Sequence, residues 1–261
     1  MKTGSLAELR AQRAQDCRLV KDRALRSLDE AEEFLRDRRI LTLVADSALP
    51  SLFGAIHEAG LPGKSGFGSW PKTKWPWGGE LASRPGVRTL KIHRGKLTFV
   101  SPEAASIVDP LCREALARAE DGSEGEVAAA IVRHLAAAGP SSLDDLKAEL
   151  DLQPKALRSA REKLERVGAV VSRGTVLAAV EGGHRHSSEL ARWDQAHGAR
   201  RKVSPAVALE DLLALGVRAA VVAHEDEART WFSWPVERDV IARLLGAARL
   251  RRAGPGWLAA P

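Results

Sequence analysis

Residues 125–180 read GEVAAAIVRHLAAAGPSSLDDLKAELDLQPKALRSAREKLERVGAVVSRGTVLAAV, and this stretch decides the fold. Apolar residues recur at helical spacing up to Pro140, which indicates a first helix. The Ser-Ser pair that follows begins a short second helix, and two aspartates lie in its first turn. A turn at 151–153 leads into a basic third helix, and β-branched residues then form a hairpin. This order of helices, turn and hairpin predicts a winged helix-turn-helix.

The third helix of this stretch carries the candidate binding face. Its inner side is apolar at helical spacing, whereas its outer side is polar and largely cationic, although Glu162 and Glu165 dilute the positive field. A recognition helix needs outward donors that reach phosphates and base edges. We therefore predict nucleic-acid contacts from the helix and from a hairpin tip at Arg173-Gly174, through Lys155, Arg158, Ser159, Arg166 and Arg173. The alternatives are a solvated helix face and a protein-binding domain.

The overall composition agrees with an anionic partner. The chain has 261 residues and a net charge of +6, with a pI near 9.6, which favours nucleic acid. Cys17 and Cys112 lie far apart and match no metal-ligand spacing, so we predict a reducing compartment, no metal and no cofactor. No apolar stretch is long enough to span a membrane. We expect a cytoplasmic, nucleoid-associated protein, and the sequence leaves the oligomeric state open.

The remaining sequence predicts further units of the same kind. Ser27 and Glu30 stand in capping-box positions before a helix, and residues 88–101 alternate on both sides of Arg94-Gly95, as in a β-hairpin. We predict an α+β fold of two or three tandem winged helix-turn-helix units with an N-terminal helical arm. The predicted boundaries are an arm at 1–26, an N-terminal winged-helix-like domain at 27–122, a central winged helix at 123–182, a linker at 183–205 and a C-terminal winged-helix-like domain at 206–261.

The C-terminal unit is the least regular of the three. Residues 219–234 favour a strand, an acidic turn and a second strand. Pro235 suits the first turn of the closing helix that follows. The chain then ends in a short apolar tail around Trp257.

The loop at 65–81, SGFGSWPKTKWPWGGEL, combines tryptophans with lysines. Such a loop can stack on unpaired bases and neutralise phosphates, or it can form a structural plug over a small core. We name as base-stacking candidates Trp70, Trp75 and Trp77. The additional cationic candidates, from this loop and from the predicted hairpin, are Lys72, Lys74, Arg94 and Lys96. Glu80 is the one carboxylate of the loop and a weak catalytic candidate.

Four segments together resemble the AlkZ-type winged-helix DNA glycosylase superfamily. They are SLDEAEEFLRDRRI at 27–40, WPKTKWPWGGEL at 70–81, the central winged helix, and WFSWPVERDVIARLLGAARLRR at 231–252. The resemblance covers most of residues 27–253 and implies tandem winged helices around a DNA-binding channel. In that family a Gln-x-Gln motif positions water and stabilises the sugar cation during excision of alkylated or crosslinked bases.

The chain has only four glutamines, and no two of them are separated by a single residue. We therefore expect binding to duplex or damaged DNA, with single-stranded DNA as a further option, in a damage response or in genome maintenance. Two alternatives remain open on the nucleic-acid side, an active DNA glycosylase and a transcriptional regulator. A third alternative is a protein-interaction scaffold.

Overall fold

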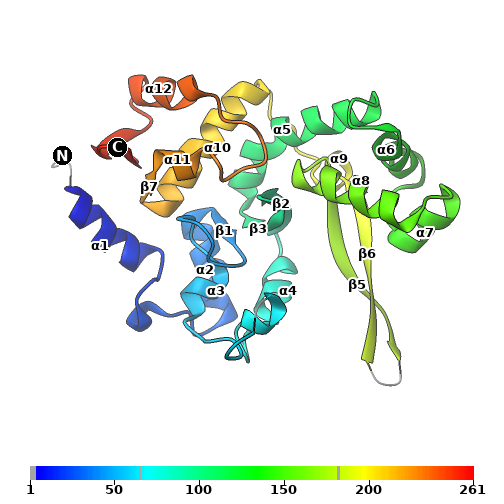
Figure 1. The fold of residues 1–261 in the computed structure, drawn as a ribbon, viewed down its shortest axis with the longest axis horizontal. Coiled ribbons are helices and arrows are strands. Elements are labelled where there is room, and N and C mark those ends of the chain that lie inside the picture. The colour runs from blue at the N-terminus through cyan, green and yellow to red at the C-terminus, as the bar shows by residue number, and fades with distance from the viewer. Residues whose placement is uncertain (1–3, 65, 181–182) are drawn as a thin grey trace.

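Three small antiparallel sheets organise the computed structural model, which describes residues 4–64, 66–180 and 183–261 (Figure 1). In each sheet the last strand in sequence lies between the other two, giving the orders β1-β3-β2, β4-β6-β5 and β7-β9-β8. Helices lie between the strands in sequence and cover the sheets. The fold is therefore α+β, as the sequence predicts, and one arrangement of elements occurs three times.

The first repeat covers residues 28–100. Its elements are α2 (Leu28–Arg38), β1 (Ile40–Thr42), α3 (Leu52–Ile56), α4 (Trp77–Ala82), β2 (Arg88–His93) and β3 (Lys96–Val100). The side chain of Ser27 caps α2 by accepting a hydrogen bond from the backbone N–H of Glu30, which confirms the predicted cap. The β2–β3 turn falls at Arg94-Gly95, also as predicted, with both residues at positive φ.

The second repeat covers residues 126–192 and contains the three helices predicted at this position. They are α6 (Glu126–Ala138), α7 (Leu143–Glu149) and α8 (Pro154–Arg166), together with β4 (Ser141–Ser142), β5 (Val170–Val180) and β6 (Gly183–Arg192). Ser142 begins α7 with a complete capping box formed with Asp145. The three helices predicted in this segment are therefore present, in the predicted order.

The hairpin of this repeat is longer than predicted. Arg173 pairs with Glu189 inside the β5–β6 ladder, so the tip predicted at Arg173-Gly174 is wrong. Residues 183–192, predicted as linker, form β6 instead. The reason is that residues 183–192 pair with β5 across the hairpin and, at Glu189 and Leu190, also with β4, and these ladder hydrogen bonds override a weak local pattern. The β5–β6 hairpin extends well beyond the helices (Figure 1).

The third repeat covers residues 205–259. It consists of α10 (Pro205–Ala220), β7 (Val222–His224), α11 (Glu225–Ala228), α12 (Arg238–Gly246), β8 (Arg251–Gly254) and β9 (Trp257–Ala259). The predicted second strand ending at residue 234 is wrong, because this segment makes only one isolated bridge, from Phe232 to His93. Pro235 precedes the Glu237 N-cap of α12, and the predicted tail around Trp257 is the central strand β9.

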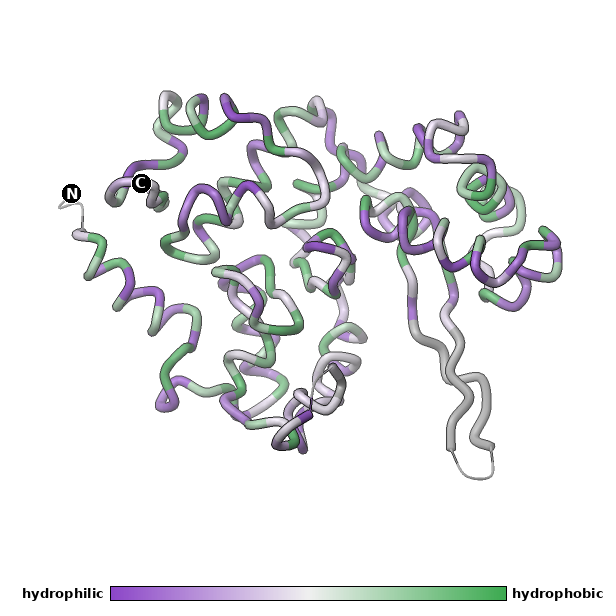
Figure 2. Tube along the Cα trace, in the orientation of Figure 1, coloured by the Kyte–Doolittle hydropathy of each residue, from purple (hydrophilic) through white to green (hydrophobic). Residues whose placement is uncertain are grey.

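Two helices outside the repeats join them. The long helix α5 (Pro102–Glu120) packs against α10 in the largest apolar core, which residues of all three repeats share. The arm helix α1 (Leu6–Asp16) packs its buried Leu9 against the third repeat, near β7 and Trp257. Hydrophobic and hydrophilic positions alternate along the helices in Figure 2, so that each helix has one face for these cores.

Candidate nucleic-acid interface

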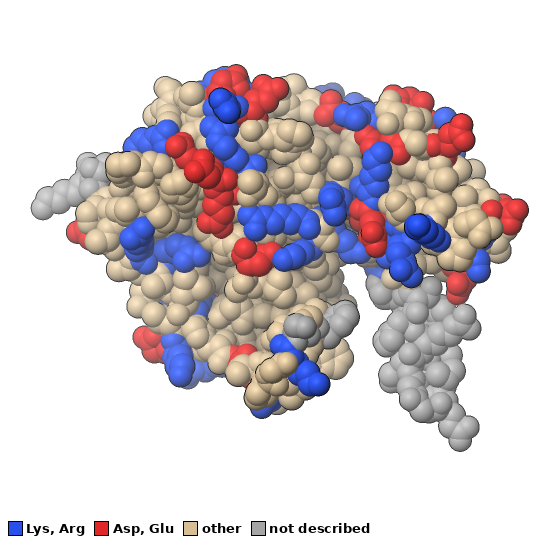
Figure 3. Space-filling view, in the orientation of Figure 1, with Lys and Arg blue, Asp and Glu red and all other residues tan. Residues whose placement is uncertain are grey.

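Helix α8 exposes the cationic face that the sequence predicts. Pro154 stands in its first turn, where a missing N–H costs no hydrogen bond, and Leu157 and Leu164 are buried. The outward residues Lys155, Arg158, Ser159 and Arg166 are all exposed. Among the residues that the structure describes, no ion pair involves Lys155, Arg158 or Arg166. Figure 3 shows Lys and Arg side chains over α8 and across the centre of the same face, with acidic side chains between them.

The C-terminal end of α8 lies against the first repeat. A Cβ built on Gly95 would be 3.4 Å from Nε of Arg166, so this guanidinium lies over the β2–β3 turn. Glu165 is 2% exposed and accepts a 2.6 Å ion-pair hydrogen bond from Lys91 of β2. The prediction that Glu165 dilutes the outward positive field is therefore wrong, because its carboxylate faces inward and is neutralised there.

A groove runs between the first two repeats. It has a volume of about 610 Å³ and is lined on one side by α4 and β2, and on the other by the start of β5 and the short helix α9 (Trp193–Ala196). Arg173 lines this groove together with two arginines that the sequence reasoning missed, Arg84 and Arg88. Arg84 forms ion pairs with Asp29 at 2.6 Å and Glu32 at 3.6 Å. The groove therefore carries cations from both repeats.

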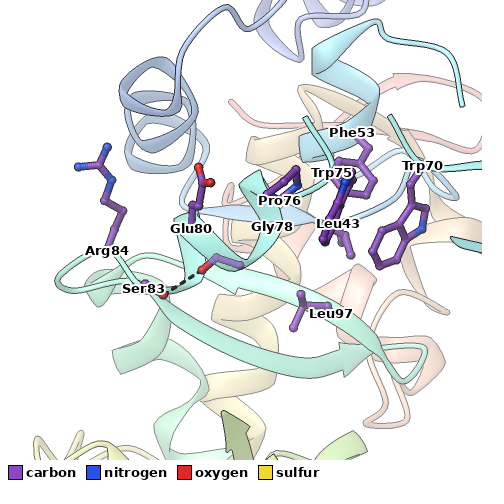
Figure 4. A pocket seen from close by; sticks show the side chains of 11 residues that line it. Leu43, Phe53, Trp70, Trp75, Pro76, Gly78, Glu80, Ser83, Arg84 and Leu97 are labelled. Atoms are coloured by element: carbon purple, nitrogen blue, oxygen red, sulfur yellow. Dashed lines mark hydrogen bonds between the residues drawn. The ribbon is translucent and has the colours of Figure 1, made fainter. Parts of the chain in front are cut away.

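An apolar pocket of about 610 Å³ adjoins the groove at the tryptophan-rich loop (Figure 4). Trp70 packs edge-on against Phe53 with ring centroids 5.3 Å apart, and Trp77 packs on the core of the first repeat. Trp75 is 56% exposed and lines the pocket. Glu80, in the first turn of α4, is exposed and also lines the pocket. Both sequence interpretations of the loop thus have a structural counterpart, and they fall on different tryptophans.

The additional cationic candidates differ in their contacts. Lys72 is exposed, whereas partners inside the molecule are found for Lys74, Arg94 and Lys96. Lys74 donates to the carbonyl of Leu25 at 2.9 Å and lies 4.9 Å from the Trp77 ring centroid. Arg94 and Lys96 bind residues of the first and third repeats at the turn that they flank. Their partners are Asp46 and Thr230.

A polar cluster around the buried His93, at the β2–β3 turn, was not predicted from the sequence. Arg94 donates to the Thr230 hydroxyl at 2.7 Å and to the Thr230 carbonyl at 3.1 Å. His93, fully buried, donates from Nε2 to the Asp46 carboxylate at 3.1 Å, and Lys96 pairs with the same carboxylate. These contacts join the first repeat to the third. Alternation along β2 gave no signal for this cluster, since His93 directly follows the buried Ile92.

Burial and hydrogen bonds together set the protonation states of His93 and Asp46. Burial lowers the pKa of His93 below its ordinary value, and contact with Asp46 only partly offsets the effect. Burial alone raises the pKa of Asp46, but hydrogen bonds from Lys96 and His93 reverse this and leave it lowered. Asp46 is therefore ionised and His93 neutral near pH 7. The cluster is a charged clamp between two repeats.

Within residues 4–64, 66–180 and 183–261, no helix is both long enough and apolar enough to cross a bilayer. In the same part of the chain, the His, Cys, Asp and Glu side chains form no group that would bind a metal.

Comparison with known proteins identifies the fold. No family model and no curated protein matches the sequence. Among solved structures, the DNA glycosylase AlkZ of Streptomyces sahachiroi is similar, with a TM-score of 0.57 and 14% sequence identity. The match covers 95% of this chain and 67% of that protein. The chain therefore has an AlkZ-like fold.

Proposed function

We propose that this chain is a DNA-binding protein built of tandem winged-helix units, acting in DNA damage response or genome maintenance. The observation that carries the proposal is the exposed cationic face of α8, where Lys155, Arg158 and Arg166 pair with no acidic side chain of the described residues, together with the groove that holds further arginines. The sheet order, repeated three times with helices between the strands, supports winged-helix units. The similar AlkZ structure is that of a DNA glycosylase, which favours DNA over other anions.

The proposed contacts divide the predicted residues into two groups. Exposed residues whose side chains make no hydrogen bond or ion pair with other described residues would touch DNA, namely Lys72, Lys155, Arg158, Ser159, Arg166 and Arg173. Residues with internal partners would instead hold the folded chain together, namely Lys74, Arg94 and Lys96. Phosphate contacts from the first group would set affinity and register, since Lys and Arg at a duplex surface act chiefly on the backbone.

A binding panel tests the proposal. The full chain is titrated by fluorescence anisotropy against single-stranded, duplex, nicked and alkylated DNA, with RNA as a control, at two salt concentrations. Binding to at least one DNA form that weakens steeply with salt supports the proposal. Absence of salt-dependent binding to every DNA form would refute it and favour a protein-interaction scaffold. A strong preference for one palindromic duplex sequence would favour a transcriptional regulator.

Base excision is a second candidate function, favoured by the AlkZ-like fold and by the position of Glu80 on a pocket. The chain lacks the Gln-x-Gln pair, so a carboxylate would have to act beside the nucleotide in its place. Incubating the protein with alkylated duplex and measuring abasic sites tests this candidate. Release of modified base that is lost in Glu80→Gln would establish it, and absence of release would leave DNA binding alone.

A further inference from the structure

We infer that the apolar pocket beside Trp75 receives one unpaired nucleobase of DNA bound in the adjoining groove. This inference rests on the proposed DNA binding and adds to it a preferred DNA structure, a duplex in which a base is free to leave the stack. The occupant is chosen by three features of the site: an open aromatic surface, continuity with the cationic groove, and the polar groups at the rim.

The open aromatic surface belongs to Trp75 alone. The other two tryptophans of the loop pack on the core of the first repeat, whereas Trp75 is more than half exposed. Exposing this much indole to water is unfavourable, and most indoles with a structural role are covered. A planar, weakly polar occupant would cover it. Nucleobases fit this description, because each has a π-face that stacks on aromatic side chains whatever its sequence.

The pocket and the groove form one continuous depression. They share the lining residues Gly78, Gly79, Ser83, Arg84 and Leu97. The absence of side chains at Gly78 and Gly79 keeps the passage between them open, and a Cβ on Gly78 would lie 3.0 Å from Leu43 of the pocket wall. A nucleotide strand along the arginines of the groove would therefore place a base beside the pocket without leaving its phosphate contacts.

The rim supplies polar groups of the right kind. Glu80 is the one carboxylate among the described residues that line the pocket. Its side chain forms no hydrogen bond with another described residue. A carboxylate there accepts hydrogen bonds from the N–H groups on a base edge. Ser83 and Arg84, which line both the pocket and the groove, are the other polar groups of the rim. A purely apolar ligand would leave these groups without a role.

The test compares two duplexes of identical sequence, one fully paired and one with a single bulged 2-aminopurine. The wild-type chain should bind the bulged duplex at least about fivefold more tightly and quench the 2-aminopurine fluorescence, since stacking on an aromatic side chain contributes about 5- to 150-fold in affinity per base. Trp75→Ala should remove the preference and the quenching while leaving affinity for the paired duplex within twofold. Trp75→Phe should retain most of the preference.

Leu61→Ala is the matched control, since Leu61 is 53% exposed in the neighbouring segment and does not line the pocket. It should behave as wild type. The inference is overturned if the wild type shows no preference for the bulge, or if Trp75→Ala keeps the preference or weakens both duplexes equally. If the wild type binds neither duplex, the proposed DNA binding itself is refuted.

Discussion

Removing two cations from α8 should change how salt affects DNA binding. The double variant Arg158→Ala/Arg166→Ala deletes two exposed guanidinium groups that have no ion-pair partner in the described structure. If each contacts one phosphate, the slope of log K against log salt should become shallower by about 1.8, at about 0.9 per contact. Affinity at about 0.1 M salt should then fall about 60-fold relative to wild type, with the difference vanishing towards 1 M.

Fluorescence anisotropy with one labelled duplex, measured between about 50 and 200 mM salt, gives both the slope and the affinity. The control Arg36→Ala/Arg118→Ala removes the same net charge from two exposed arginines that already pair with Glu32 and Glu124. It should change the slope much less. Equal slopes for the α8 variant and the wild type, or equal changes in variant and control, would refute α8 as the binding face.

Three further predictions concern stability and the hairpin. Gly168→Ala should cost at least about 1 kcal/mol in chemical denaturation, because φ is 69° and the new Cβ would lie 2.5 Å from Sγ of Cys112; Gly246→Ala, with open space around it, should be near neutral. The pKa of His93 is lowered in the folded state, so the unfolded chain takes up a proton first as the pH falls. The free energy of unfolding should therefore decrease as pH drops below about 6.5, and less steeply in His93→Gln. Identical pH profiles of stability for the wild type and His93→Gln would contradict this assignment. Replacing residues 175–187 of the β5–β6 hairpin by Asn-Gly should leave the melting temperature within a few degrees but weaken duplex binding; unchanged binding would exclude this hairpin as a contact.

The sequence by itself determined the elements that depend on neighbours along the chain. The three helices of the second repeat are those that the sequence predicts, because apolar periodicity and the Ser142 cap act within one or two turns. The Arg94-Gly95 turn was predictable for the same reason. The outward cations of α8 followed from helical spacing alone, because residues opposite a buried face are exposed.

Only the tertiary structure decided what depends on distant partners. Strand β9 forms because β7, distant in sequence, supplies ladder hydrogen bonds, and β6 likewise pairs at Glu189 and Leu190 with the distant strand β4. Arg94 became a clamp because Thr230 lies beside it in space, although 136 residues separate them in sequence. Packing likewise covered Trp70 and Trp77 and left Trp75 open. Sequence specifies which side chains can bind or stack, whereas the folded chain decides which of them find internal partners and which remain for a ligand.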